Sequence, residues 1–259
     1  MQRFHNKRVL VTGSGRGIGQ AIAERFAREG ARVQLVARSQ AELDETKRGL
    51  EAFSAEIRAT ALDLTLPDSA GQIISEVEKA WGGLDILVTN AGAAAQGGFL
   101  ELDDESWPDG FGLKLFANLR IIKRAWPLLK SSSGHLVMIG GGTARTPEKH
   151  LSLVSAVNGG IAALSKSVAE QGIEDGIHVN LVQPGTIQTS RRKKLMEKLA
   201  AQQGMPLEAF AKEAPRRLGI SRLGEPSDIA EVVSFLCTEE ARFVQGAILD
   251  VDGGQNKGI

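Results

Sequence analysis

The sequence contains no tyrosine among its 259 residues, and Cys237 is its only cysteine. A single cysteine excludes a disulfide within the chain and favours a reducing compartment. No apolar run approaches the roughly 18 residues that a membrane span requires. A first strand beginning near residue 8 leaves no room for a signal peptide. We therefore expect a cytoplasmic protein that does not contact a membrane.

An excess of charge of one sign is also missing. The 31 basic residues balance the 31 acidic residues, so the formal net charge is zero. A nucleic-acid partner would require a basic surplus or a basic face, so none is expected. Apolar residues make up 42% of the chain, enough for a buried core, and the length suits one α/β domain over residues 1–259. No metal site is predicted.

Short runs rich in Val, Ile and Leu alternate with amphipathic helical stretches along the whole chain. The expected strands are 8–12, 32–37, 57–62, 84–89, 134–140, 177–182 and 246–251. The expected helices are 17–29, 40–52, 67–80, 103–130, 152–173, 190–213 and 226–237. This alternation predicts a Rossmann-type doubly wound sheet of seven parallel strands. The long connection 186–224 follows a strand end, where ligands bind in such sheets, so we expect a lid or substrate loop there.

Four glycines lie between the first expected strand and the first expected helix: Gly13, Gly15, Gly17 and Gly19. Glycine permits a tight turn and the close approach of backbone to a pyrophosphate. The helix that follows directs its unpaired N–H groups and the positive end of its dipole at the phosphates. The strand-loop-helix context makes this a predicted dinucleotide site rather than a simple turn.

The end of the second expected strand indicates which dinucleotide binds. A carboxylate there would hold the ribose 2′-OH of NAD, but Ala37 stands at that place. Arg38 and Arg16 can instead pair with a 2′-phosphate through charge-assisted hydrogen bonds. With no acid at this strand end, we predict NADP(H) in preference to NAD(H).

Five motifs in order along the chain resemble those of the short-chain dehydrogenase/reductase family, and the chain is similar to 3-oxoacyl-carrier-protein reductases. The motifs lie at 12–19, 63–64, 90–92, 180–189 and 251–254. The resemblance implies a carbonyl or alcohol oxidoreductase that forms a homotetramer or homodimer through its two long helices. The Gly- and Ala-rich stretch 159–169 would permit close packing there. Together with Arg38 at the end of the second expected strand, these motifs predict the cofactor-binding residues Gly13, Ser14, Arg16, Gly17, Ile18, Gly19, Asp63, Leu64, Asn90, Ala91, Gly92, Pro184, Gly185, Thr186, Ile187 and Thr189.

The catalytic positions depart from that family, which usually employs Asn, Ser, Tyr and Lys. Aligned on the small-residue helix, Val154 occupies the tyrosine position, Asn158 the lysine position and Gly141 the serine position. Trp107 and Pro127, used as rulers, place Lys114 at the asparagine position. Valine transfers no proton and glycine has no hydroxyl, whereas acid–base catalysis is worth about 10²- to 10⁴-fold in rate.

The Lys and Asn side-chain types are exchanged between Lys114 and Asn158. We hypothesise that Lys114 brings an ammonium to the nicotinamide ribose from the other helix, with Asn158 bonding a ribose hydroxyl or water. The alternative is that Lys114 points to solvent or into a subunit interface. Lys114 could also donate the substrate proton if burial lowers its pKa. Other candidate donors are Thr143, His150, Ser155 and Ser152, the last also a candidate N-cap.

The long connection carries basic residues that could meet an anionic substrate or form a solvated helix face: Arg191, Arg192, Lys193, Lys194, Arg216, Arg217 and Arg222. Three functions remain open at this point. The first is an NADP(H)-dependent carbonyl or alcohol oxidoreductase with a non-standard catalytic centre. The second is a non-catalytic NADP(H)-binding sensor or inactive oligomer partner. The third is an isomerase or dehydratase that uses Lys114 in the same cleft.

Overall fold

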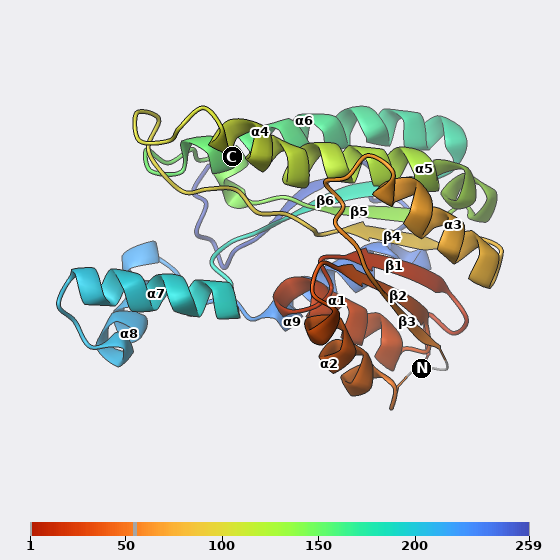
Figure 1. Ribbon diagram of the computed structural model, residues 1–259, viewed down its shortest axis with the longest axis horizontal. Helices are drawn as coiled ribbons and strands as arrows, with labels where there is room; N and C mark the ends of the chain where they lie inside the picture. Colours follow the sequence, from red (N-terminus) through yellow and green to blue (C-terminus); the bar gives the residue numbers. More distant parts are fainter. Residues whose placement is uncertain (1, 54–55, 259) are drawn as a thin grey trace.

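A parallel sheet of seven strands forms the centre of the computed structural model, which describes residues 2–53 and 56–258 (Figure 1). The strand order is β3-β2-β1-β4-β5-β6-β7, and every neighbouring pair is parallel. The strands are β1 Arg8–Thr12, β2 Arg32–Ala37, β3 Ile57–Ala61, β4 Ile86–Thr89, β5 His135–Ile139, β6 His178–Pro184 and β7 Ile248–Val251. The predicted doubly wound sheet is therefore confirmed.

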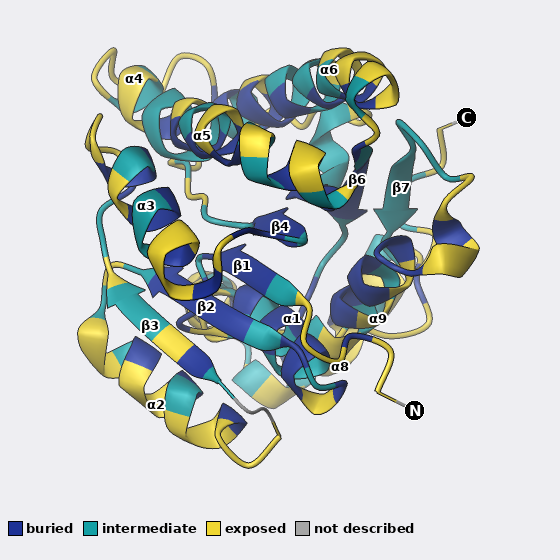
Figure 2. Ribbon diagram, turned by 90° about the vertical axis from the view of Figure 1, so that its right-hand side faces the viewer, coloured by how far each residue is buried: buried dark blue, intermediate teal, exposed yellow. Residues whose placement is uncertain are grey.

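Helices cover both faces of the sheet (Figure 2). One layer holds α1 Gly17–Arg28, α2 Gln40–Leu50 and α9 Pro226–Leu236, and the other holds α3 Ser69–Trp81, α4 Ser106–Phe111, α5 Ala117–Ser132 and α6 Ser152–Asp175. Successive strand side chains point to opposite faces, so Val9 and Val11 join the first core and Leu10 the second. Two-sided burial explains why the strands are apolar runs rather than alternating patterns. Within the described part of the chain, no helix is long and apolar enough to cross a bilayer.

The strand order reverses at β1 and β4, which lie side by side. Their onward connections diverge to opposite halves of the sheet, which leaves a crevice beyond their carboxyl ends. The glycine loop follows β1, and Asn90 follows β4. The fold therefore brings the first and third sequence motifs to one crevice.

The segment 186–224 is an excursion that is closed at its base. The Gln188 amide donates to the Gly224 carbonyl over 2.7 Å, and the Gly224 amide donates to the Thr186 carbonyl over 3.0 Å. Beyond this closure, α7 Ser190–Gln202 and α8 Leu207–Leu218 stand away from the sheet (Figure 1). They share a small apolar core of their own, formed by Met196, Ala200, Phe210, Ala214, Ile220 and Leu223.

The single helix predicted over 190–213 is wrong, because the chain breaks between α7 and α8. Gly204 adopts φ +62°, a left-handed conformation that ends a helix, and Pro206 precedes the first residue of α8. This break lets the chain turn back, so that the apolar faces of both helices meet.

The predicted helix over 103–130 is likewise interrupted. A π-helical turn, Gly112–Phe116, separates α4 from α5 and carries Lys114. Asn118 secures this turn, because its Nδ2 donates to the Lys114 carbonyl over 2.8 Å and to the Ala91 carbonyl over 3.3 Å. A π turn re-aims the side chains that it carries, and such turns are frequent at functional sites.

Candidate active site

The glycine loop forms a cradle in which backbone replaces side chains. A Cβ on Gly19 would lie 2.3 Å from the Gly13 carbonyl oxygen, so no larger residue fits there, and Gly13 adopts φ +64°. Asn90 fixes the loop from the end of β4, donating from Nδ2 to the Thr12 and Gly13 carbonyls, each over 3.1 Å. At the start of α1, Arg16 makes no side-chain cap bond and the first turn holds no acid. The free N–H groups there suit an anion such as a pyrophosphate.

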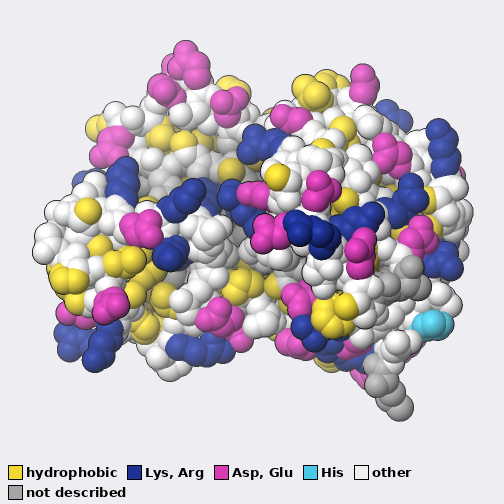
Figure 3. All heavy atoms as spheres, turned by 60° about the horizontal axis from the view of Figure 1, so that its bottom comes forward, with side chains coloured by type: hydrophobic (Ala, Val, Ile, Leu, Met, Phe, Trp, Pro, Cys, Tyr) yellow, Lys and Arg dark blue, Asp and Glu magenta, His cyan; other side chains and the backbone are white. Residues whose placement is uncertain are grey.

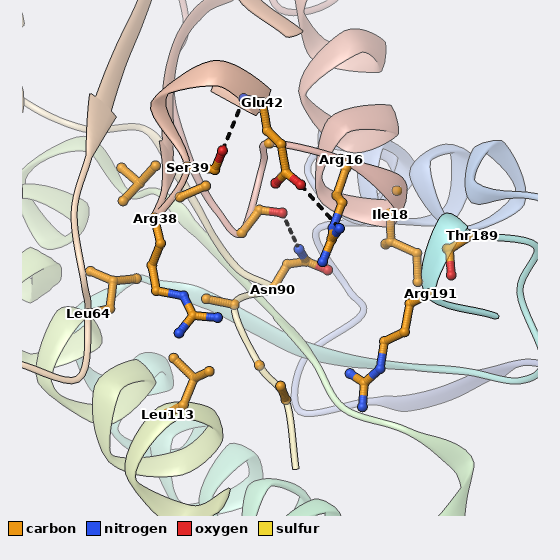
Figure 4. Close-up of a pocket in the computed structure, with 18 of the residues that line it drawn as sticks. Arg16, Ile18, Arg38, Ser39, Glu42, Leu64, Asn90, Leu113, Thr189 and Arg191 are labelled. Atoms are coloured by element: carbon orange, nitrogen blue, oxygen red, sulfur yellow. Dashed lines mark hydrogen bonds and ion pairs between the residues drawn. The ribbon is translucent and has the colours of Figure 1, made fainter. Parts of the chain in front are cut away.

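A cavity of about 640 Å³ opens beside this cradle (Figure 4). Its volume lies within the range of sites that bind a small molecule or cofactor. We call it the cofactor cavity. Ten residues of the predicted cofactor set line it: Gly13, Arg16, Gly17, Ile18, Arg38, Leu64, Asn90, Ala91, Gly92 and Thr189.

The other predicted cofactor residues lie elsewhere. Ser14 is fully buried and accepts a hydrogen bond at Oγ from the Val36 amide over 2.8 Å, so it ties the loop to β2. The Asp63 carboxylate accepts from the amide and hydroxyl of Thr65, and these bonds lower its pKa. Gly19 packs against Gly13, as described above. Two neighbouring cavities are lined by the remaining residues, which are Pro184, Gly185, Thr186 and Ile187.

An acid that the sequence analysis missed stands at the far end of the cofactor cavity. Glu42 lies 3.1 Å from the Arg16 guanidinium, while Arg38 comes from the end of β2 (Figure 4). The Glu42 amide donates to the Ser39 hydroxyl, which caps α2. The end of β2 carries no acid, as noted from the sequence, but the first turn of α2 brings one to the same place. The Ser-x-x-Glu spacing, typical of a helix start, could have located it.

Lys114 and Asn158 meet between α5 and α6. Lys114 Nζ donates to Asn158 Oδ1 over 2.5 Å and to the Gly140 carbonyl over 3.4 Å. Asn158 is 2% exposed, and its Nδ2 donates to the Thr143 hydroxyl over 2.8 Å. The Thr143 oxygen accepts this hydrogen bond, so the hydroxyl can still donate its own hydrogen to a further acceptor.

The stem of the Lys114 side chain packs against Gly92, and Gly92 lines the cofactor cavity. A Cβ on Gly92 would lie 2.7 Å from Lys114 Cγ, so the glycine that lines the cavity also admits the lysine. Burial, reinforced by the charge of Arg191, lowers the pKa of Lys114 to about 8. The side chain is therefore mostly protonated at pH 7 and is a stronger acid than an ordinary lysine.

Asn158 lines a second cavity of about 410 Å³, and we call it the substrate cavity. Val154 and Gly141 line it, so neither the tyrosine nor the serine position supplies a hydroxyl. A Cβ on Gly141 would lie 2.7 Å from Asn158 Nδ2, so glycine here makes room for the asparagine. Thr143 also lines this cavity and brings a hydroxyl two residues beyond the usual serine position.

The remaining candidate donors are placed less well. His150 lines the substrate cavity but is largely exposed, and its Nε2 lies 3.3 Å from Glu148. Ser155 is buried, and its hydroxyl has no hydrogen-bond partner among the residues that the structure describes. Ser152 is the first residue of α6 rather than its N-cap, which is Leu151, and its hydroxyl donates to the Lys149 carbonyl. The prediction that Ser152 caps the helix is therefore wrong.

The basic residues of the excursion do not gather into one patch. Figure 3 shows basic and acidic side chains interspersed over the face that it draws. Arg217 pairs with Glu213 and Arg222 with Asp228, each over 2.7 Å. Arg191 lines the cofactor cavity. The others in the segment include Lys193, Lys194 and Arg216, which are exposed, and Arg192, which lines the substrate cavity.

Comparison with known proteins agrees with this fold. The family described as enoyl-(acyl carrier protein) reductase has a model that matches residues 13–256. The 3-oxoacyl-[acyl-carrier-protein] reductase FabG of Vibrio cholerae is 31% identical over 252 residues, which is 97% of this chain and 98% of that protein. An uncharacterized oxidoreductase of Bacillus subtilis, YxbG, is 30% identical over 98% of this chain and 92% of its own length. The chain belongs to the short-chain dehydrogenase/reductase family.

Solved structures extend the likeness to three dimensions. L-Sorbose reductase from Gluconobacter frateurii, complexed with NADPH and L-sorbose, superposes with a TM-score of 0.94 at 31% identity, over the full length of both chains. An actinorhodin polyketide ketoreductase variant with NADPH gives a TM-score of 0.92 at 29% identity, covering 100% of this chain and 99% of that one. Both relatives carry NADPH in their crystals.

Proposed function

We propose that this protein is an NADP(H)-dependent carbonyl or alcohol oxidoreductase in which Lys114 replaces the usual tyrosine and lysine. The observation that carries the proposal is the position of the Lys114 ammonium. The ammonium is held by the Gly140 carbonyl and by Asn158, which lines the substrate cavity, while its stem packs against Gly92, which lines the cofactor cavity. A positive charge at that place suits both a nicotinamide ribose and a carbonyl oxygen that gains negative charge.

The residues present fit NADP(H). The N–H groups at the start of α1 and the glycine loop would hold the pyrophosphate, and Arg16 with Arg38 would hold the 2′-phosphate. The two relatives with crystal structures that contain NADPH support this choice. When bound, the cofactor supplies the hydride for the carbonyl carbon, or accepts it in the reverse reaction.

The chain's own groups then supply the proton and orient the substrate. The Thr143 hydroxyl accepts a hydrogen bond from Asn158 and donates one to the carbonyl oxygen of the substrate, which orients the substrate without transferring a proton. As the carbonyl carbon gains a hydride, the oxygen takes one proton from the Lys114 ammonium through water, which leaves a neutral amine. A pKa of about 8 makes this transfer easier than from an ordinary lysine and leaves the proton in place at pH 7.

A non-catalytic NADP(H)-binding role is the second candidate. The observation that favours it is the wall of the substrate cavity, where Val154 and Gly141 offer no hydroxyl. In that case the variant Val154→Tyr, Asn158→Lys, Gly141→Ser, Lys114→Asn would consume NADPH, whereas the natural chain would only bind it.

Two measurements test the proposal. Titration of NADPH fluorescence reports binding, and NADPH consumption over a panel of aldehydes, ketones and oxo-acids reports turnover. We expect Lys114→Met to lose about 10²- to 10⁴-fold in kcat. Lys123→Met, which removes an exposed lysine of α5, is the matched control and should leave kcat unchanged. Binding of NADPH without turnover on any substrate would favour the non-catalytic role, and absence of binding would overturn both.

A further inference from the structure

Arg192 is the one lysine or arginine that lines the substrate cavity in the described part of the chain. It lies in the first turn of α7, and its backbone amide donates to the Thr189 hydroxyl. Its neighbours Lys193 and Lys194 are exposed. The excursion therefore brings one guanidinium to the cavity that Asn158 and Thr143 also line.

The Arg192 guanidinium has no partner among the described residues. Its Nε is inaccessible to solvent and makes no hydrogen bond. The ion pairs that neutralise Arg217 and Arg222 have no counterpart here. Burial lowers the pKa of Arg192, opposed by the charge of Glu148. A partly desolvated cation without a partner costs free energy, and an anion that reaches it removes part of that cost.

The other walls limit which anion fits. Apolar side chains supply much of the lining, from Leu151, Val154, Leu195, Leu199 and Leu218. Two carboxylates, Glu148 and Asp252, also line the cavity. Asp252 is already held by the Gly254 and Asn256 amides. These acids repel a dianion, so one negative charge on an apolar body matches the cavity better than a phosphate.

We propose that Arg192 binds a substrate carboxylate, so that the protein reduces an oxo-acid with an apolar body. The proposal rests on the reductase function proposed above. The planar guanidinium can donate two parallel hydrogen bonds to the oxygens of a carboxylate, and such a bidentate pair sets the orientation of the ligand as well as its affinity. The carbonyl then lies toward Thr143 and Asn158, and the apolar body lies against the leucines of the excursion.

Calorimetric titration of the NADPH complex tests this with a matched pair of probes, 2-oxo-4-phenylbutanoate and its methyl ester. We expect the acid to bind about 10- to 100-fold more tightly than the ester, because hydrogen bonds to charged groups are worth that much. Arg192→Gln should remove the preference, Arg192→Lys should retain part of it, and Lys193→Gln should leave it intact. Thermal unfolding checks that each variant is folded.

Turnover separates this proposal from the one on which it rests. A preference for the acid in binding, without NADPH consumption, would sink the reductase function and keep the carboxylate site. Equal binding of acid and ester, no binding of the acid, or a preference that survives Arg192→Gln would overturn the carboxylate site, whatever the turnover. Tighter binding of the corresponding phosphonate than of the carboxylate would also overturn it, in favour of a phosphate-bearing ligand.

Discussion

Relative to the family pattern that the resemblance implies, lysine and asparagine exchange places between Lys114 and Asn158, and the contacts of both residues agree with such an exchange. By resemblance, the family's lysine would stand at Asn158, yet the ammonium here comes from Lys114 and reaches Asn158 Oδ1 over 2.5 Å. Two neighbouring glycines admit this arrangement. Gly92 makes room for the lysine stem, and Gly141 makes room for the asparagine amide. The positive charge beside Asn158 therefore comes from Lys114 in the π-helical turn and not from a residue of α6.

The pKa of Lys114 gives a pH profile. If the ammonium is the active form, the rate of reduction should be constant well below pH 8 and should fall as the pH rises through about 8. Lys114→Arg keeps the charge and does not titrate in this range, so its residual activity should show no such fall. The measurement is kcat at saturating NADPH and saturating substrate, taken between about pH 6 and pH 10. A wild-type profile that is flat through pH 8 would contradict the assignment.

The same shift predicts the direction of a change in stability. The folded pKa of Lys114 is depressed, so between about 8 and the ordinary value of 10.5 the unfolded chain binds more protons than the folded chain. The free energy of unfolding contributed by this group therefore rises with pH across that window. Urea titrations of the wild type and of Lys114→Met at pH 7.5 and pH 10 should show that the free energy of unfolding of the wild type, relative to that of the variant, is larger at pH 10. The opposite trend would contradict burial as the cause.

Glu42 is expected to weaken the binding of NADPH. Its carboxylate occupies Arg16 and would repel a 2′-phosphate at the same place. Glu42→Gln should tighten NADPH binding by about tenfold, which corresponds to about 1.4 kcal/mol, and should change NADH binding little. Fluorescence titrations with both cofactors measure the difference, with Glu45→Gln, also on α2, as the control. Equal gains for NADH and NADPH would show that Glu42 does not discriminate between them.

At the scale of elements, α6 and the π-helical turn before α5 act as a pair. The turn aims Lys114 at α6, and Asn118 holds the turn by bonding its carbonyl. Neither helix alone contains the site. A loss of stability caused by a substitution at Asn158 should therefore be recovered, at least in part, by a matching substitution at Lys114.

A double-mutant cycle tests that coupling. Asn158→Lys alone sets a second ammonium beside Lys114, so we expect a lower free energy of unfolding and weaker NADPH binding. Adding Lys114→Asn removes the repulsion and should recover stability, with an interaction energy of about 0.5–3 kcal/mol. Urea denaturation of the four proteins gives the cycle. Additive effects would show that the two positions do not interact.

The sequence predicted the sheet well, because buried parallel strands leave long apolar runs and the glycine loop has a fixed place after the first. It also identified Lys114 and Asn158 as candidate site residues, because aligning the family's catalytic positions requires only the spacing between residues. It did not predict the π turn, which Asn118 secures through a bond to the distant Ala91 carbonyl. The break at Gly204 was missed although Gly204 and Pro206 are local signals that a helix ends. The Arg16–Glu42 pair was missed for the same reason as the π turn. It joins the glycine loop to α2, and only tertiary structure brings them together.

At the scale of the whole molecule, the outer face of α6 is the predicted contact between subunits. A Cβ on Gly159 would meet no atom within 4 Å, and Ala163 is exposed, so another helix can approach closely here. Ile173, at the end of the same helix, is 63% exposed. Burying this face in a second copy removes apolar surface from water, which is the usual source of dimer stability.

Ala163→Arg should therefore shift the protein toward the monomer, because a long charged side chain prevents the helices from approaching. Light scattering after size-exclusion chromatography measures the change, and Ala156→Ser on the same helix serves as a mild control. NADPH binding should persist in the monomer, since no residue of α6 lines the cofactor cavity in the described part of the chain. Turnover is more sensitive, because α6 also carries Asn158 and Val154. A wild type that is monomeric at micromolar concentration would contradict the predicted assembly and leave the cofactor site unaffected.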